Sequence, residues 1–529
     1  MTIINMGGLN LSINWGEHRW AVFYCLVATI GALCYGYDSI YYTGIQGMYH
    51  FKRDYGTRTA PGSDEEWELG TVFLSVSASI IYVGEFVGAI LAAPINDKFG
   101  RRAVFACASV CIIIGAIVQL CSYGIDGVFY VGRVFVGLGV GQFTATCLIY
   151  VADVAPTEIR GPALMCFQFM QSIAQFIGAC VNQGTETIDG AASYRLPVGL
   201  LCILPLTMLV LLPFIPESPA WFMTKGRREA AAAALTKINR SKPNYSPEPD
   251  LVVIEDAVQL ELEMESESSW ASLITDPVER RKLLYACGVM FAQQINGIQF
   301  WYTYGVIFAQ SIGVGEPFTI NTIIYVVQIV TVGLSVVFGN KMNRRTNLLV
   351  CTMGMIISLV AVGGLGTTRD GDGNFSRGVG IGIVVFAYIN IVCYNFSIGT
   401  LSYTIASEMA VGRNRNKITA CALGTFFFTV WMMVFTSPYM YYDADLGPML
   451  GFVYAGTSLV TLAYSWFCVG ETTGRTNAEL ERFFSDRIPV RQWKNHVWAD
   501  DFGSKIEADK AGEGRVESVV NMPKSEDKA

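Results

Sequence analysis

Twelve runs of about twenty mostly apolar residues recur along the chain and are separated by polar loops. A helix needs about 20 consecutive apolar residues to cross the hydrocarbon core of a bilayer, so each run predicts a membrane-spanning helix. An even number of crossings places both termini on the same side. The predicted spans are 20–45, 69–94, 103–124, 127–150, 161–182, 196–215, 282–310, 317–339, 347–366, 378–407, 416–440 and 449–469.

The Lys and Arg residues in the short loops orient these spans, because positive residues concentrate in cytoplasmic loops. With the N-terminus inside, the short inner loops hold ten such residues and the outer loops hold six. We therefore expect both termini in the cytoplasm. Asn374, in Asn374-Phe375-Ser376, then heads the one glycosylation sequon in an outer loop.

A long polar segment in the middle of the chain divides the spans six and six. It contains an Ala-rich stretch and an acidic stretch, which predict short amphipathic helices on the cytoplasmic face. The pattern indicates an all-α membrane protein with two groups of six helices. Its predicted parts are a cytoplasmic N-terminus (1–19), a first six-helix group (20–215), a linker with short helices (216–281), a second six-helix group (282–469) and a cytoplasmic tail (470–529).

Composition and motifs exclude several other classes. The chain is 52% hydrophobic and 15% charged, whereas soluble chains carry roughly 25% charged residues. The formal net charge of −7, without a dense Lys/Arg stretch, argues against a nucleic-acid binder. No enzyme motif such as a nucleotide-binding loop, a zinc-protease sequence or a nucleophile elbow is present. The three histidines lie outside the apolar runs, which argues against a metal site within the membrane. Together, these features predict no enzyme activity, no cofactor and no metal site.

The two halves of the chain repeat similar loop motifs in the same order. Residues 96–102 join the second and third predicted helices, and residues 340–345 join the eighth and ninth with a similar Asn- and Arg-rich sequence. Asp153 precedes Arg160 by seven residues, as Glu408 precedes Arg415. An internal repeat at this scale predicts two structurally related halves.

These motifs resemble those of the sugar porter family of the major facilitator superfamily, and the resemblance covers about Asp38 to Phe484. The sequences that carry it are DKFGRR, GRVFVGLGVG, YVADVAPTEIRG, PESP, QQINGIQFWYTY and ETTGRT. VNQGT and SYRLPVGL are most similar to fungal members, which include sugar/proton symporters. The resemblance implies the major facilitator fold, with two bundles that rock around a site at the middle of the membrane.

Paired acidic and arginine residues recur at the predicted cytoplasmic ends of both halves. We interpret them as a gating network, whose charge-assisted hydrogen bonds form when the inner ends of the bundles close. Its predicted members are Asp97, Arg101, Arg102, Asp153, Arg160, Glu217, Arg344, Arg345, Glu408, Arg415 and Glu471.

Ionisable residues deep inside predicted spans are rare and are functional candidates. Asp38 and Arg133 match the positions where proton-coupled members of the family carry a carboxylate opposed by an arginine, which implies a proton-coupling role. The alternative is a static ion pair. Glu85 is either a second protonatable group or a carboxyl group that holds helices together, and we favour the second interpretation.

Sugars present many hydroxyl groups and flat apolar faces, which amides and aromatic rings recognise. Gln168 and Gln175 are seven residues apart and therefore share a helix face. We expect Gln171 to join helices rather than to bind sugar, because amides also stabilise helix packing in membranes. The resemblance and the amide pattern together predict a substrate site of Gln168, Gln175, Gln293, Gln294, Gln299, Tyr304, Gln328, Gly399 and Tyr403.

Several positions depart from the family pattern and leave the substrate open. Gln299 stands where Asn is usual, and Thr400 replaces a proline. Phe426 and Phe427 stand where an Asn-Trp pair is frequent, which makes one side of the pocket less polar.

The function predicted is secondary transport of a hexose or disaccharide by proton symport. The partners would be the sugar, the proton and the lipid bilayer, for a monomer in the plasma membrane. A facilitative sugar or polyol uniporter and a transporter-like nutrient receptor are the alternatives.

Overall fold

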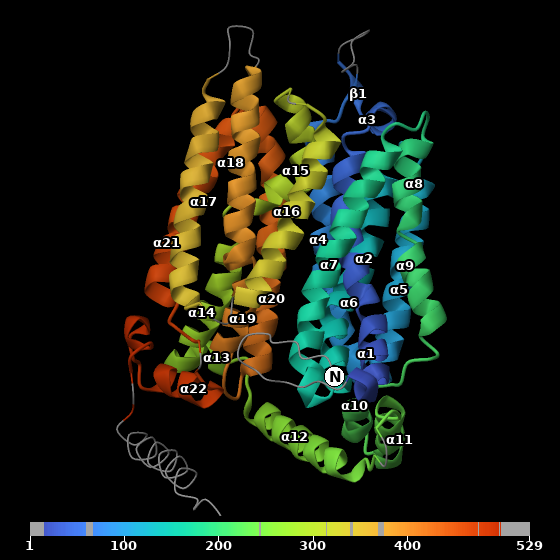
Figure 1. Cartoon of the computed structure of the whole chain (residues 1–529), viewed down its shortest axis with the longest axis vertical. Helices are drawn as coiled ribbons and strands as arrows, with labels where there is room; N and C mark the ends of the chain where they lie inside the picture. The colour runs from blue at the N-terminus through green and yellow to red at the C-terminus, as the bar shows by residue number, and fades with distance from the viewer. Residues whose placement is uncertain are drawn as a thin grey trace, which may run out of the picture.

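The computed structural model describes residues 15–59, 67–242, 245–313, 315–338, 342–368, 375–473, 475–496 and 498. Its helices form two bundles that stand side by side, one from each half of the chain (Figure 1). We call the end that carries the middle segment the linker face, and the end that carries the two short strands the hairpin face. Both are visible in Figure 1, at the bottom and the top respectively.

The N-terminal bundle contains six spans, of which the first and the last are each built from two consecutive helices. The helices are α1 (Trp15–Ala28) with α2 (Ile30–Ile45), α4 (Thr71–Phe99), α5 (Arg101–Leu120), α6 (Asp126–Val154), α7 (Thr157–Thr185), and α8 (Ala192–Leu200) with α9 (Ile203–Leu211). On the hairpin face lie α3 (Tyr49–Tyr55) and the antiparallel strands β1 (Thr57–Arg58) and β2 (Trp67–Glu68).

The C-terminal bundle repeats this plan. Its spans are α14 (Pro277–Gln294) with α15 (Ile298–Ser311), α16 (Pro317–Phe338), α17 (Arg344–Gly366), α18 (Arg377–Phe396) with α19 (Ile398–Met409), α20 (Arg415–Pro438) continued by the π-helix η1 (Tyr439–Asp443), and the 3₁₀ turn η2 (Gly447–Met449) with α21 (Leu450–Cys468).

The predicted twelve-helix fold is confirmed, with boundaries that differ by several residues. Within the described ranges, ten helical segments are long and apolar enough to cross a membrane. The other two spans are α7 and the pair α14–α15, which carry many amide side chains. The helices α4, α6 and α7 each run for 29 residues and therefore extend beyond the predicted spans.

Buried breaks interrupt two of the C-terminal spans. Gly297 separates α14 from α15 with φ of +77°, and a Cβ there would lie 2.2 Å from the Tyr454 ring. Only glycine adopts this conformation readily and leaves room for the ring. Ser397 interrupts α18 and α19, so this span breaks without the proline that the family pattern has at position 400.

The N-terminal bundle is held by close helix contact as well as by apolar side chains. A Cβ at Gly141 of α6 would lie 2.0 Å from the backbone oxygen of Glu85 in α4. Small residues permit this approach between membrane helices, where packing supplies much of the association energy.

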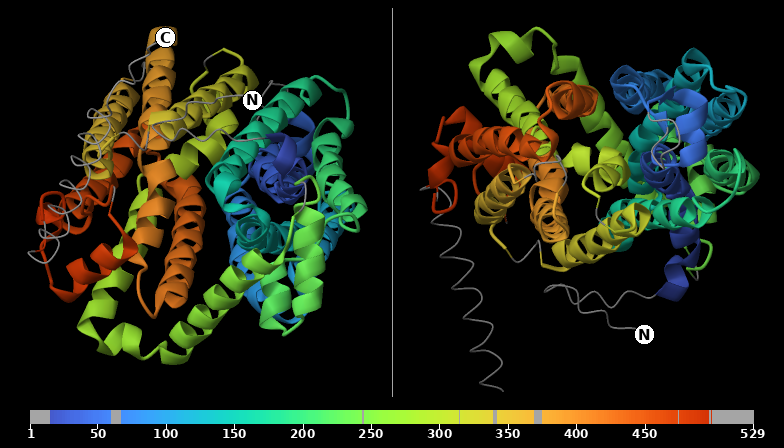
Figure 2. Two further views of the ribbon diagram at one scale, coloured as in Figure 1. Left: turned by 60° about the horizontal axis from the view of Figure 1, so that its bottom comes forward. Right: turned by 90° about the horizontal axis from the view of Figure 1, so that it is seen from above.

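The middle segment forms short helices beneath both bundles. They are α10 (Pro219–Thr224), α11 (Arg228–Ile238), α12 (Glu248–Glu267) and α13 (Ser272–Thr275). Figure 2 shows α12 crossing from the α10–α11 side to the other bundle. After α21, α22 (Asn477–Ser485) and the 3₁₀ turn η3 (Val490–Gln492) also lie on the linker face (Figure 1).

Candidate functional site

A cavity lies between the two bundles, and side chains from both halves line it. Its volume is about 100 Å³. Its lining is dominated by amide and tyrosine side chains from α2, α4, α7, α14, α15, α16, α18, α19 and α20. The lining residues are Tyr35, Ser39, Tyr82, Gln168, Gln171, Gln175, Gln293, Gln294, Gln299, Tyr302, Thr303, Tyr325, Gln328, Tyr394, Asn395, Gly399, Thr400, Tyr403 and Phe426.

The amide groups are oriented by hydrogen bonds to one another and to the broken helices. Gln293 Nε2 donates to the Gly399 carbonyl oxygen at 3.0 Å, and Gln299 Nε2 donates to Gln294 Oε1 at 3.1 Å. Gln328 Nε2 of the C-terminal bundle donates to Gln175 Oε1 of the N-terminal bundle at 2.7 Å. The cavity therefore contains a direct hydrogen bond between the two bundles.

Two amide oxygens in this cavity are buried acceptors without a donor. Gln293 Oε1 and Gln328 Oε1 accept no hydrogen bond from the described residues. Because each NH₂ group is already engaged, the free end of each amide is its oxygen. A buried acceptor that is left unpaired is costly, and a ligand hydroxyl group satisfies it.

The structure brings together eight of the nine residues predicted for the substrate site. The exception is Tyr304, whose hydroxyl donates to the Val434 carbonyl oxygen at 2.9 Å and which does not line the cavity. Gln171, expected to join helices, does line it. The sequence interpretation did not include Tyr35, Tyr82, Tyr325, Tyr394 and Asn395, since tyrosines and a lone amide inside apolar helices give no distinctive pattern.

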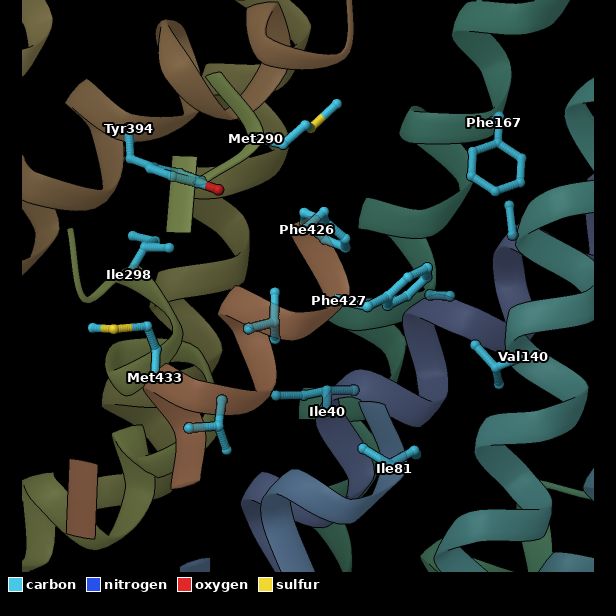
Figure 3. Packing of buried hydrophobic residues seen from close by; sticks show 14 of the residues in the cluster. Ile40, Ile81, Val140, Phe167, Met290, Ile298, Tyr394, Phe426, Phe427 and Met433 are labelled. Carbon is cyan, nitrogen blue, oxygen red and sulfur yellow. The ribbon is translucent and has the colours of Figure 1, made fainter. Parts of the chain in front are cut away.

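Apolar rings close one side of the cavity. Phe426 lines it and packs against Tyr403, with ring centroids 5.7 Å apart. Phe427 is also buried but lies outside the lining. Figure 3 shows both rings projecting from α20 toward the N-terminal bundle, with Tyr394 farther into the C-terminal bundle. The less polar side expected from the sequence is thus formed by Phe426.

Asp38 and Arg133 lie together inside the N-terminal bundle, with 3.6 Å between Asp38 Oδ1 and Arg133 Nη1. Arg133 has other partners, since it donates to the Ser77 carbonyl oxygen at 3.0 Å and to the Tyr41 hydroxyl at 3.0 Å. Its guanidinium also lies 4.3 Å from the centre of the Tyr42 ring. Asp38 Oδ1, in contrast, accepts no hydrogen bond from the described residues. Arg133 is therefore fixed independently of the carboxylate.

Glu85 is the second buried carboxyl group in this bundle, with 2% of its surface exposed. Its Oε2 atom accepts no hydrogen bond from the described residues. The interpretation of Glu85 as a helix-joining group is therefore not supported by a hydrogen bond at this atom.

The charged residues at the linker face form two similar clusters. In the first, Glu217 accepts hydrogen bonds from the backbone N–H groups of Arg101 and Arg102 at 2.9 and 3.1 Å. Arg101 Nε also pairs with Asp153 at 3.2 Å. The carboxylate of Glu217 thus caps the N-terminus of α5, where the helix dipole favours negative charge.

The second cluster repeats this geometry in the other bundle. Glu471 accepts from the backbone N–H groups of Arg344 and Arg345 at 3.0 and 3.3 Å, and Arg344 pairs with Glu408. The ion pairs and caps described for both clusters join elements of the same half of the chain.

The interactions described for the two clusters do not include Asp97, Arg160 or Arg415 of the predicted network. Asp97 and Arg415 are exposed, and the Asp97 carbonyl oxygen accepts from Trp221 Nε1 at 3.0 Å. The side chain of Arg160 and the whole of Asn374 lie outside the described part of the chain.

The hydrogen bonds that join the bundles cluster at the cavity and toward the hairpin face. Lys52 Nζ donates to Gln310 Oε1 at 2.8 Å, and Thr71 Oγ1 donates to Asp443 at 2.8 Å. Gln183 Nε2 donates to Thr319 Oγ1 at 3.0 Å. Two pairs of spans, α4 with α20–η1 and α7 with α16, are therefore tied together on the hairpin side of the cavity, and α3 is tied to α15.

Two six-helix bundles with a polar cavity at their boundary define a membrane transport protein of the major facilitator superfamily. The fold is similar to that of the xylose transporter XylE from E. coli in a partially occluded inward open conformation. That structure has a TM-score of 0.70 and 21% identity, and the match covers 86% of this chain and 99% of that one. A structure of the proton:xylose symporter XylE bound to 6-bromo-6-deoxy-D-glucose also has a TM-score of 0.70, with 20% identity over 88% of this chain and all of that one.

The chain belongs to the family described as "Sugar (and other) transporter", whose sequence model matches residues 24–484. It is 28% identical over 493 residues to the low-affinity glucose transporter HXT3 of Saccharomyces cerevisiae, a match that covers 92% of this chain and 86% of the relative. The low-affinity glucose transporter of Kluyveromyces lactis is 27% identical over 91% of this chain and 85% of its own length. The predicted family is therefore confirmed, and the relatives are transporters rather than enzymes.

Proposed function

We propose that this sugar transporter carries a hexose, and that protons move in the same direction as the sugar. The sugar binds in the cavity between the bundles and reaches either side as the bundles rock around it. The observation that carries the proposal is the pair of unsatisfied buried acceptors, Gln293 Oε1 and Gln328 Oε1, in an amide-lined cavity.

The size of the cavity favours a monosaccharide over a disaccharide. One water molecule needs roughly 10–15 Å³ of the space that its centre can occupy. Measured in the same way, the cavity of about 100 Å³ accommodates fewer than about ten water-sized groups. That is the scale of a single sugar ring. Relatives named as glucose and hexose transporters support the same substrate class.

Proton coupling is supported by the unequal way in which Asp38 and Arg133 are held. The hydrogen bonds from Arg133 to α2 and α4 do not involve Asp38, so they need not break when Asp38 becomes neutral. The Asp38 carboxylate is buried beside Arg133 at 3.6 Å, and its Oδ1 atom accepts no hydrogen bond from the described residues. It therefore loses little when it takes up a proton, because burial disfavours its charged form. XylE, which shares the fold, is named as a proton:xylose symporter.

In the proposed cycle, Asp38 takes up a proton from the outside when the cavity faces outward. The neutral carboxyl group then permits the bundles to reorient with the bound sugar. Asp38 releases the proton on the inner side, and Arg133 compensates the charge that returns. One proton therefore crosses with each passage of the loaded carrier.

The linker-face clusters would stabilise the outward-facing conformation, in which the inner ends of the bundles are closed. When the inner ends of the bundles approach, the arginines of one cluster come within reach of the acidic residues of the other, and charge-assisted hydrogen bonds hold them. The hydrogen bonds on the hairpin side, such as Lys52 to Gln310, would hold the outer ends of the bundles together in the opposite, inward-facing conformation.

The orientation and location follow from the loop charges and the relatives. We place the linker face and both termini in the cytoplasm, because the short loops at that end hold most of the Lys and Arg residues. The plasma membrane is the proposed residence, a monomer is the proposed functional unit, and Asn374 is a proposed glycosylation site.

The proposal is tested by uptake of labelled glucose, xylose, maltose and a polyol into cells that lack their own sugar carriers, with and without a protonophore. Wild type, Asp38→Asn and the matched control Asp256→Asn, an exposed position of α12, are compared. We expect wild type and the control to accumulate hexose above the external concentration, and to lose this accumulation with the protonophore.

Asp38→Asn is expected to equilibrate hexose without accumulating it. Accumulation that resists the protonophore, or that survives in Asp38→Asn, contradicts proton coupling through Asp38. Equilibration by the wild type indicates a uniporter. Sugar binding without any uptake indicates a receptor.

A further inference from the structure

The linker-face end of α21 carries an arrangement that sugar transport does not explain. After α22 the chain crosses the end of α21, and the Arg491 guanidinium lies 5.2 Å from the ring centres of both Trp466 and Phe467. Arg345 of α17 lies 5.4 Å from the same Trp466 ring. Two guanidinium groups are therefore held against one indole ring.

A cleft of about 380 Å³ opens beside these rings, between α14, α21, α22 and the segment that follows it. Three of its lining residues are arginines, namely Arg281, Arg487 and Arg491. None of the described residues that line it is acidic. Within the described ranges, none of the three arginines forms an ion pair, whereas Lys282 next to the cleft is paired with Glu279 and Glu481. The cleft thus holds a concentration of positive charge that the described part of the chain does not neutralise.

A second cleft of about 250 Å³ lies between α17, the end of α21 and the segment after α22, and adds to this charge. Arg345, Arg491 and Lys494 line it together with Trp466. Glu471, the one acidic residue among the described residues that line it, already accepts hydrogen bonds from the backbone at the start of α17. Arg491 is common to both clefts, so the positive region is continuous around the end of α21.

The rings beside the first cleft face outward at the end of a membrane-spanning helix. Phe467 is 63% exposed and Trp466 is 46% exposed. Aromatic residues at such positions lie at the level of the lipid headgroups, and arginines there reach toward the same level along their aliphatic stems. A ligand for this cleft therefore combines an anionic group with an apolar part that lies in the membrane.

We propose that the cleft lined by Arg281, Arg487 and Arg491 binds the phosphate of an anionic phospholipid, whose acyl chains lie along Phe467. Guanidinium groups suit this ligand because they donate paired hydrogen bonds to phosphate oxygens. The anion also relieves the repulsion between Arg491 and Arg345. On the orientation proposed above, the cleft faces the cytoplasmic leaflet, where anionic lipids concentrate.

The test uses the full-length purified protein in detergent, equilibrated with mixtures of phosphatidylserine and phosphatidylcholine, with bound lipid counted by native mass spectrometry. Wild type is compared with Arg487→Gln/Arg491→Gln. The matched control is Lys225→Gln/Lys237→Gln, which removes the same charge from exposed positions of the middle segment. Lipid binding is measured without sugar, so its outcome is independent of the proposed substrate and of proton coupling.

We expect wild type and the control to retain phosphatidylserine over phosphatidylcholine, and the arginine variant to lose this preference by about tenfold, as for the loss of charge-assisted hydrogen bonds. Equal retention by the arginine variant and the control overturns the proposal. Displacement of the lipid by soluble glycerol phosphate at equal concentration also overturns it, because the site would then recognise a free anion. Phosphatidylserine binding that appears only after residues 499–529 are removed would assign the cleft to the chain's own tail.

Discussion

Gln293 offers the sharpest test of how the cavity recognises sugar. Its NH₂ group is fixed by the Gly399 carbonyl oxygen at 3.0 Å, so its oxygen is the end that faces a ligand. Gln293→Met has a similar volume but replaces the amide oxygen with a thioether sulfur, which is only a weak acceptor. A hydrogen bond is worth about 0.5–1.5 kcal/mol net, and a sugar hydroxyl left unpaired in a desolvated site costs about 1–3 kcal/mol. We therefore expect KM for hexose to rise about tenfold.

The assay is initial-rate uptake of glucose and of a series of monodeoxyglucoses by cells that produce matched amounts of each variant. For the analogue that lacks the hydroxyl bound by Gln293, wild type and Gln293→Met should have the same KM, because neither retains that hydrogen bond. Gln142→Met is the matched control, since Gln142 is buried in the N-terminal bundle but does not line the cavity. The reasoning is refuted if Gln293→Met leaves KM unchanged, or if its effect is the same for every analogue.

Three further predictions address the clusters, the packing and the tail. Glu217→Gln should lower Vmax about tenfold with little change in KM, since it weakens caps worth about 1.5–3 kcal/mol far from the cavity; equal losses in both parameters would contradict this. Gly141→Val should abolish folded protein in fluorescence-detected size-exclusion chromatography, because its Cβ would lie 2.0 Å from the Glu85 oxygen, whereas Gly456→Val, with open space around it, should not. Partial burial raises the pKa of Glu479, but hydrogen bonds from Thr476 and Arg475 outweigh it and hold the pKa below its usual value. The contribution of Glu479 to the stability of α22 is therefore present near neutral pH and lost as pH falls through that lowered value. Hydrogen exchange in α22, corrected for the intrinsic effect of pH, should become faster in acid for the wild type, whereas in Glu479→Gln it should not change with pH. Protection of the wild type that does not change with pH, as in Glu479→Gln, would contradict this.

Helical periodicity accounts for most of the amides that line the cavity, including Gln171, which we interpreted from the sequence as a helix-joining residue. Gln168, Gln171 and Gln175 follow the spacing of one helix face, and all three line the cavity. The same periodicity explains why Tyr304 does not. Residues two apart on a helix point in nearly opposite directions, at about 200°, so Tyr302 faces the cavity while Tyr304 bonds to the Val434 carbonyl oxygen.

Other features depend on contacts between distant parts of the chain and are not visible in a sequence pattern. The span containing Ser397 breaks without a proline, and the broken helix supplies the Gly399 carbonyl oxygen that orients Gln293. The acidic and arginine motifs indicated a network at one end of the bundles. Only the structure shows that Glu217 and Glu471 act as caps on α5 and α17 within their own halves.

The central claim is that Asp38 couples proton movement to sugar movement, and its most direct test uses purified protein in vesicles that contain a pH-sensitive dye. An imposed glucose gradient, without any initial pH difference, should drive protons in the direction of the sugar for wild type and for Asp256→Asn. Asp38→Asn should move glucose down its gradient with no pH change. Glucose movement by the wild type without a pH change, or a pH change that persists in Asp38→Asn, would contradict the account.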